Sequence, residues 1–116
     1  MAENRFRIQT IEAANVIELQ LPQMLDSQEF DRINESILGA LHGQAHEKWI
    51  IDLTQVSYMG SAMLGLMVNL RQQIKTAGGR LVLCAMPPSL FQIFRTCCME
   101  RLFTIAKTRG DALRMI

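Results

Sequence analysis

Apolar and polar residues alternate in two short runs near the start of the chain. Residues 6–10 and residues 16–21 both show this alternation, which is typical of strands with one buried face. Residues 12–15 connect the two runs, so the segment is predicted to form a hairpin with one face in water. Pro22 has no backbone N–H to give to a sheet, and we expect it to end the second strand.

The pattern then changes to the period of a helix. Residues 28–41 repeat apolar side chains three and four positions apart, which predicts an amphipathic helix that Asp26 or Ser27 caps. Residues 49–53 form a short apolar run, which is typical of a strand covered on both faces. This strand is therefore predicted to lie inside the sheet.

The longest helical pattern covers residues 61–77. Its apolar stripe is expected to face the core, and it consists of Met63, Leu66, Met67, Leu70 and Ile74. Gly78-Gly79 follows and is predicted to supply the left-handed C-cap of this helix. Residues 81–84 then form a second buried strand. A strand, a helix and a strand in this order predict a right-handed parallel crossover.

Two more helices and a strand complete the pattern. Pro87-Pro88 favours the start of a helix, residues 103–105 predict a short strand, and a last helix is expected from about residue 109. The predicted order is β-β-α-β-α-β-α-β-α, so the fold class is α/β, with helices packed on an open mixed sheet. Residues 1–116 contain no linker or repeat and are expected to form one domain.

Composition limits the classes of function. Of the 116 residues, 49% are hydrophobic, which is enough for a core without disulfides or metals. The 12 basic residues balance 11 acidic ones and form no run, so nucleic acid is not an expected partner. No apolar run approaches the ~20 residues of a membrane span. The amino terminus, with Glu3, Arg5 and Arg7, does not resemble a signal peptide. We expect a cytoplasmic protein that does not insert into membranes.

Side chains that could carry catalysis or bind a metal are scattered. The three cysteines form no C-x-x-C pair and indicate reduced thiols; they are Cys84, Cys97 and Cys98. His42 and His46 are separated by Gly43, which favours a solvated loop over a metal site. Asp52 ends a buried strand and is expected to hold the following loop by hydrogen bonds. The sequence predicts neither an enzyme nor a cofactor.

A set of motifs in fixed order makes the segment from residue 49 onward specific. An apolar strand ends in Asp-Leu, a loop leads to a serine at a helix start, and Gly-Gly, Leu-Val-Leu and Leu-Phe-x-Ile follow. The matching residues are Asp52-Leu53, Val56, Ser61, Leu64, Gly65, Gly78-Gly79, Leu81-Val82-Leu83 and Leu102-Phe103-Thr104-Ile105. In this order and spacing the chain resembles STAS domains, the family of bacterial anti-sigma factor antagonists and related modules. The resemblance implies the STAS fold over nearly the whole chain.

The sequence departs from the family pattern at the helix start. That pattern reads Asp-Ser-Ser/Thr-Gly-Leu, whereas Gly60 stands in the place of the Asp, Ala62 in that of the second hydroxyl residue and Met63 in that of the Gly. Ser61, at the family's usual phosphorylation site, is retained. Cys98 also stands where a Gly is common. The departures leave the fold assignment intact and weaken the argument for a phosphorylation switch.

Ser61 has two interpretations. A helix start attracts anions, so a phosphate on Ser61 would be stabilised there and would repel an acidic or tightly packed partner. Alternatively, Ser61 is an N-cap that contributes ~1 kcal/mol. For Gly60, loss of the family's Asp would weaken recognition by a kinase, whereas the alternative is that glycine supplies a positive φ.

The residues around Ser61 are predicted to form a partner-binding surface. Met59 and Met63, at the turn and the helix start, are the candidates for exposure there, although Met63 also belongs to the apolar stripe; Met67 is expected in the core. Tyr58 is a candidate contact, although packing in a half-buried position is an equal alternative. The full set is Tyr58, Met59, Gly60, Ser61, Ala62, Met63 and Leu64.

The resemblance implies a regulatory protein-binding module. Its partner would be an anti-sigma factor with serine kinase activity, and phosphorylation of Ser61 would weaken the complex. The alternative is a STAS subunit without a switch, in a signalling scaffold or a transporter ATPase complex. A thiol or metal enzyme is the least favoured hypothesis. The sequence leaves the partner, the kinase and the oligomeric state open.

Overall fold

The computed structural model describes residues 6–22 and 24–116. The strands are β1 (Phe6–Ile11), β2 (Ala14–Gln20), β3 (Lys48–Gln55), β4 (Arg80–Cys84) and β5 (Thr104–Ala106). The helices are α1 (Ser27–Leu41), α2 (Ser61–Thr76), α3 (Pro88–Thr96) and α4 (Arg109–Met115). The predicted order of elements is confirmed. The expectation about a signal peptide falls mostly on residues 1–5, which lie outside the described residues.

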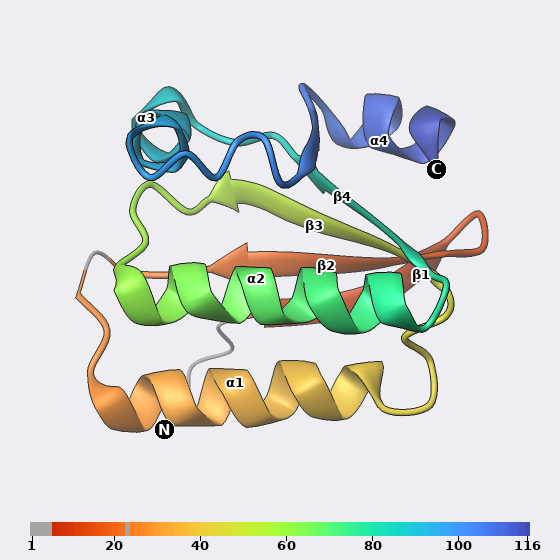
Figure 1. Ribbon diagram of the computed structural model, residues 1–116, viewed down its shortest axis with the longest axis horizontal. Coiled ribbons are helices and arrows are strands. Elements are labelled where there is room, and N and C mark those ends of the chain that lie inside the picture. Colours follow the sequence, from red (N-terminus) through yellow and green to blue (C-terminus); the bar gives the residue numbers. More distant parts are fainter. Residues whose placement is uncertain (1–5, 23) are drawn as a thin grey trace.

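The five strands form one mixed sheet in the order β1-β2-β3-β4-β5, of which Figure 1 labels β1 to β4. β1 and β2 pair in antiparallel fashion, whereas β2, β3, β4 and β5 are all parallel. The segment β3-α2-β4 is therefore the parallel crossover that the sequence predicts. The sheet places the carboxyl ends of its parallel strands at one edge, where the loop from β3 to α2 begins.

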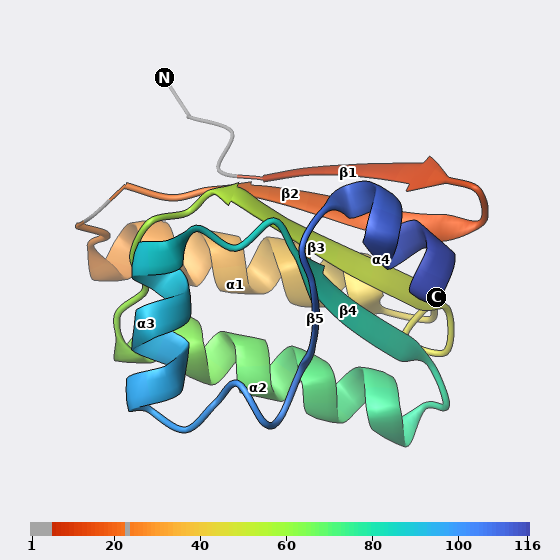
Figure 2. The ribbon, with the colours of Figure 1, turned by 90° about the horizontal axis from the view of Figure 1, so that it is seen from above.

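Helices cover both faces of the sheet, and Figure 2 shows α4 on the side opposite α1 and α2. The larger core lies on the side of α1 and α2, and Leu90 and Phe94 of α3 belong to it. The smaller core lies under α4, where Ala112 packs with Val16, Ile50 and other sheet residues. None of the helices in the described residues has the length and apolar character that crossing a membrane needs.

The hairpin differs from its prediction in two ways. The predicted wet face is wrong for β2, whose first four residues, 14–17, are all buried, because α4 covers the second face of the sheet. The connection is also shorter than residues 12–15. Glu12 and Ala13 alone form the turn, with φ of 51° and 69°, and two successive positive φ angles are the signature of a two-residue type I′ turn.

Two helices end in the same hydrogen-bonded motif. After α2, the N–H of Gly79 donates to Ile74 C=O (2.8 Å) and that of Gly78 to Lys75 C=O (3.0 Å). This is a Schellman motif, and Gly78 at φ 85° holds its left-handed position. The predicted C-cap is therefore confirmed for Gly78, while Gly79 has another role.

The end of α3 repeats the motif with a cysteine. Met99 N–H donates to Phe94 C=O (2.7 Å) and Cys98 N–H to Arg95 C=O (3.0 Å). Cys98 is left-handed, with φ 57°, which explains why glycine is common at this position of the family pattern. A side chain with a Cβ is disfavoured in this conformation.

Replacing Cys98 by glycine is expected to stabilise the protein. Cys98→Gly removes the steric cost of the left-handed backbone, and we expect the free energy of unfolding to rise by about 1 kcal/mol. Cys97→Gly is the matched control, because Cys97 is equally exposed but has φ −89°; it should destabilise instead. Urea denaturation measures both, and a destabilised Cys98→Gly protein would contradict the steric argument.

Candidate functional site

The candidate site is the loop of residues 56–60 that joins β3 to α2. Buried Val56 and Met59 hold this loop on the core. The Val56 N–H donates to Leu53 C=O (3.0 Å), and the Ser89 hydroxyl of α3 donates to Ser57 C=O (3.0 Å). The loop is therefore fixed at both ends, and between them it presents an exposed Tyr58.

The start of α2 corrects the prediction that Ser61 is an N-cap. Gly60 is the N-cap, and Ser61 is the first residue of the helix. No side chain caps this helix, and its first turn contains no acidic residue. The Ser61 side chain is exposed, and within the described residues its hydroxyl forms no hydrogen bond. Unpaired N–H groups at a helix start attract an anion, so the hydroxyl lies where a phosphate would be stabilised.

Gly60 does not need the conformational freedom of glycine. Its φ is −81° and its ψ is 178°, which any residue adopts, so the interpretation that glycine supplies a positive φ here is wrong. A Cβ at this position would meet only the Tyr58 ring, at 3.9 Å. An aspartate would therefore fit, and its absence removes a charge and a cap from the helix start.

Two methionines are more buried than predicted. Met59 is 2% exposed and Met63 is 3% exposed, so the expectation that they are exposed is wrong. Both belong to the larger core: Met59 because the loop folds inward, and Met63 because it lies on the inward stripe of α2, as that stripe predicted. Met67 is buried, as predicted. Of the seven predicted binding residues, those with exposed side chains are Tyr58, Ser61 and Ala62.

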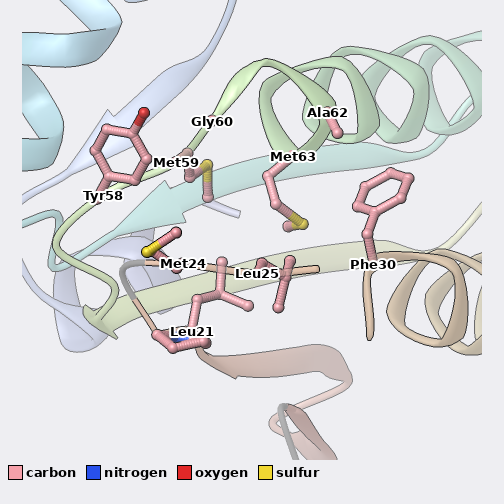
Figure 3. Close-up of a pocket in the computed structure, with 10 residues that line it drawn as sticks. Leu21, Met24, Leu25, Phe30, Tyr58, Met59, Gly60, Ala62 and Met63 are labelled. Carbon is pink, nitrogen blue, oxygen red and sulfur yellow. The ribbon is translucent and has the colours of Figure 1, made fainter. Parts of the chain in front are cut away.

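An apolar groove lies next to Ser61. It has a volume of ≈ 270 Å³ and lies between the starts of α1 and α2. Figure 3 shows the methionine side chains gathered at its centre, with Tyr58 and Phe30 on its flanks. Its lining residues are Leu21, Pro22, Met24, Leu25, Phe30, Tyr58, Met59, Gly60, Ala62 and Met63. The sequence predicted the part formed by residues 58–63 and did not predict the part formed by residues 21–30. The available signal in the sequence was the apolar pair Met24-Leu25 after Pro22, and the structure shows Met24 86% exposed.

The exposed face of α2 beyond the groove carries no charge over its first nine residues. Ser61, Ala62, Gly65, Val68 and Asn69 are exposed, and the first charged residue of the helix follows only after them. Interfaces have few charged residues at their centre. This face and the groove therefore form one continuous uncharged surface around Ser61.

Asp52 accepts hydrogen bonds from Thr54, the local contact that the sequence predicts, but β3 continues to Gln55, so Thr54 lies in the strand and not in the following loop. Asp52 Oδ1 accepts hydrogen bonds from Thr54 N–H (2.9 Å) and the Thr54 hydroxyl (2.6 Å). Its Oδ2 accepts one from Arg109 Nε (3.0 Å), and Arg109 also pairs with Glu18. Burial raises the pKa of Asp52, but the hydrogen bonds from Thr54 and Arg109 outweigh burial, and the pKa lies below its ordinary value of 3.8. The carboxylate is thus ionised at neutral pH.

Acid should destabilise the protein through Asp52. A carboxyl with a lowered pKa in the folded state contributes stability above its unfolded pKa, and this contribution is lost as the pH falls through the folded value. We therefore expect Asp52 to contribute fully near pH 6 and progressively less below its ordinary value of 3.8. Urea denaturation between pH 6 and pH 3 should show a shallower decline for Asp52→Asn than for the wild type. Equal declines would contradict the assignment.

The remaining polar candidates are not brought together. Burial raises the pKa of Cys84 to about 12, so its thiol is protonated at neutral pH, while Cys97 and Cys98 are exposed. In residues 6–22 and 24–116, no group of three or more His, Cys, Asp or Glu side chains could hold a metal ion. His42 and His46 lie in the turn after α1.

Several known proteins are similar to this chain. A STAS domain protein from Planctomyces limnophilus, described as an anti-sigma-factor antagonist, is 25% identical, with a TM-score of 0.82 over 95% of this chain and 96% of that one. The Bacillus cell fate determinant SpoIIAA in its phosphorylated form is 21% identical, with a TM-score of 0.70 over 95% and 97%. BtrV of Bordetella bronchiseptica, named as an anti-sigma factor antagonist, is 27% identical over 78 residues, 67% of each chain.

The family assignment agrees with the architecture and with the order of motifs around Ser61. The family model described as "STAS domain" matches residues 7–112. That range runs from β1 to α4 and includes the β3–α2 loop. The chain belongs to the STAS domain family.

Proposed function

We propose that this protein is an anti-sigma factor antagonist, a regulatory module that binds an anti-sigma factor and catalyses no reaction. The relatives named as antagonists support this role. The partner would contact the uncharged surface around Ser61, with Tyr58 as an aromatic anchor beside the groove. The serine kinase activity of this partner would phosphorylate Ser61 in the cytoplasm. The phosphorylated module would then release the partner.

The observation that carries the proposal is the position of Ser61. Its side chain is exposed at a helix start without a side-chain cap, and its two chain neighbours line an apolar groove. A phosphate there brings a charge of about −1.5 to −2. The helix start stabilises this charge within the module. A partner packed over the groove would have to remove water from this phosphate. The free-energy cost of burying the charge would weaken the complex.

The test compares affinities of Ser61 variants for the anti-sigma factor. Ser61→Ala should bind like the unmodified protein. Ser61→Glu should bind at least roughly ten-fold more weakly, the change that ~1.4 kcal/mol produces. Ser36→Glu is the matched control, because Ser36 is exposed on α1 and does not line the groove. Isothermal titration measures all three, and equal affinities of Ser61→Ala and Ser61→Glu would exclude the switch while leaving the binding role.

The partner itself can be identified by a pull-down from lysate of the native host. Wild type and Ser61→Glu serve as parallel baits, and mass spectrometry identifies the bound proteins. A kinase-like protein held by the wild type and lost by Ser61→Glu supports the proposed antagonist. Transporter components on both baits would contradict it.

A STAS subunit without a switch is the second candidate function. The observation that favours it is the uncapped start of α2, where Gly60 leaves room for an aspartate but carries none. If the family's aspartate contributes to recognition by the kinase, its absence makes Ser61 a poor substrate. Gly60→Asp should then raise the rate of phosphorylation by the cognate kinase, whereas a module without a switch stays unmodified in both forms.

A further inference from the structure

Asp52 connects two parts of the chain through its two oxygens. Oδ1 accepts both hydrogen bonds from Thr54, at the end of β3. Oδ2 accepts the hydrogen bond from Arg109 Nε (3.0 Å) and lies 2.9 Å from Arg109 Nη2. A carboxylate that is 8% exposed has few other positions to adopt. Arg109 therefore sets the orientation of the Asp52 carboxylate through Oδ2. The carboxylate in turn fixes Thr54 through Oδ1.

Arg109 occupies the start of α4 and reaches across the sheet. Its Nη2 pairs with Glu18 on β2 as well as with Asp52 on β3. Glu18 lies opposite Asp52, and Asp52 opposite Cys84, in the strand register. Arg109 thus neutralises two carboxylates, those of Glu18 and Asp52, that would otherwise face each other under α4.

The loop that presents Ser61 begins two residues after Thr54. Val56 enters the core directly after this contact, and Met59 enters it again before the helix. Between them only the Ser89 hydroxyl holds the loop backbone through a side-chain hydrogen bond in the described residues. The entry of the chain into the loop is therefore set at the end of β3, by the contacts of Thr54 with Asp52 and by the Val56 N–H bond to Leu53 C=O (3.0 Å).

We propose that Arg109 is a positioning residue for the partner-binding loop, acting through Asp52 and Thr54. The importance of this loop for the partner rests on the proposed function. The coupling of Arg109 to the loop is independent of that function. α4 and the Ser61 loop lie on different parts of the fold, and the Asp52 carboxylate links them. By thermodynamic reciprocity, a partner that orders the loop also tightens the attachment of α4, and a change that detaches α4 loosens the loop.

The test uses the free protein and amide exchange measured by NMR. In Arg109→Met the amide protons of Thr54 and Val56 should exchange roughly ten-fold faster, since a hydrogen bond to a charged group is lost from the chain of contacts. Arg114→Met is the matched control, because Arg114 lies on the same helix and, within residues 6–22 and 24–116, forms an ion pair with Asp111 alone. It should leave both amides unchanged. Arg109→Lys, which keeps the charge, should restore part of the protection.

A double-mutant comparison separates coupling from general destabilisation. In an Asp52→Asn background the link is already broken, so adding Arg109→Met should leave the Val56 amide unchanged. The amide of Ile17 in β2 reports global loosening of the protein, and its exchange rate should change equally little when Arg109→Met is added. Faster exchange at Val56 in both backgrounds, or at Ile17 as much as at Val56, overturns the proposal. If Arg109→Met does not fold, Arg109→Lys against Arg114→Met gives the same comparison.

A pH titration supplies a spectroscopic signature. The groups facing Asp52 are Arg109 from α4, Glu18 from β2, Cys84 from β4 and Thr54, and Arg7 of β1 lies 3.8 Å from Glu18. In the wild type, the chemical shift of the Thr54 amide should follow the protonation of Asp52. It should therefore change at a pH below 3.8, the ordinary pKa of an aspartate. In Arg109→Met the change should move to higher pH. An unmoved titration would contradict the assignment. Amide exchange and the pH titration both use the free protein without a partner. A negative result in them is therefore distinct from a negative result in the Ser61 binding test.

Discussion

Gly79→Ala is expected to cost about 3 kcal/mol or more of unfolding free energy. A Cβ at Gly79 would lie 2.2 Å from the Ala45 carbonyl oxygen and 2.6 Å from that of Glu47. Both atoms belong to backbone, so no side chain can turn away, and β4 would have to move from the segment before β3. Urea denaturation measures the loss. A change within ~0.5 kcal/mol would mean that the two segments separate easily.

Two other glycines, Gly78 and Gly65, provide the controls for Gly79→Ala. Gly78 has φ 85° and no atom within 4 Å of an added Cβ, so Gly78→Ala should cost only about 1 kcal/mol, through the left-handed backbone. Gly65 also has open space and lies inside α2. Gly65→Ala should therefore stabilise the protein by roughly 0.5–1 kcal/mol. The three variants separate a steric clash, a backbone cost and a helix-propensity gain.

Met63→Ala should unfold the protein more readily, whereas Tyr58→Ala should weaken partner binding. Met63 is 3% exposed in the larger core, and its truncation should cost about 2–5 kcal/mol. Tyr58 is 48% exposed at the edge of the groove. Its removal should change stability by less than about 1 kcal/mol and lower affinity roughly ten-fold or more, as expected for an interface anchor. Denaturation and titration against the anti-sigma factor measure the two effects.

Val68 on α2 provides a control for the Met63 and Tyr58 variants. Val68 is exposed on α2 and does not line the groove, so Val68→Ala should affect stability little. If Tyr58→Ala binds as tightly as the wild type, the partner does not use the groove edge. If Met63→Ala is as stable as the wild type, the assignment of Met63 to the core is wrong.

The local pattern of the sequence predicted the elements because each one has its own period. The run at residues 49–53 is buried on both faces in β3, as the absence of alternation indicated. The two buried faces of β2 were not predicted, because they depend on α4, whose main contribution to the smaller core is the single Ala112. A short helix with one small buried residue does not reveal which face of a sheet it covers.

The site was predictable where its contacts are local. The hydrogen bonds from Thr54 to Asp52 join residues two positions apart, and the sequence indicated this local contact, although it placed Thr54 in the loop and the structure places it in β3. The pairing of Arg109 with Asp52 and Glu18 spans 57 and 91 positions, and no pattern near Arg109 indicates it. The burial of Met59 was missed for the same physical reason, since a loop residue becomes buried only through elements that pack on it. The burial of Met63 was indicated by the apolar stripe of α2.

The strand order has a consequence for the way the chain can be assembled during synthesis. Each new strand adds to the edge left by the one made before it, because the order in space equals the order in the sequence. No strand has to enter between two that are already paired, so the sheet can grow on the ribosome as the chain emerges. Arg109 joins last, and the carboxylates of Glu18 and Asp52 lack its charge until then. The same ion pairs that couple α4 to the loop therefore also mark the completion of the fold.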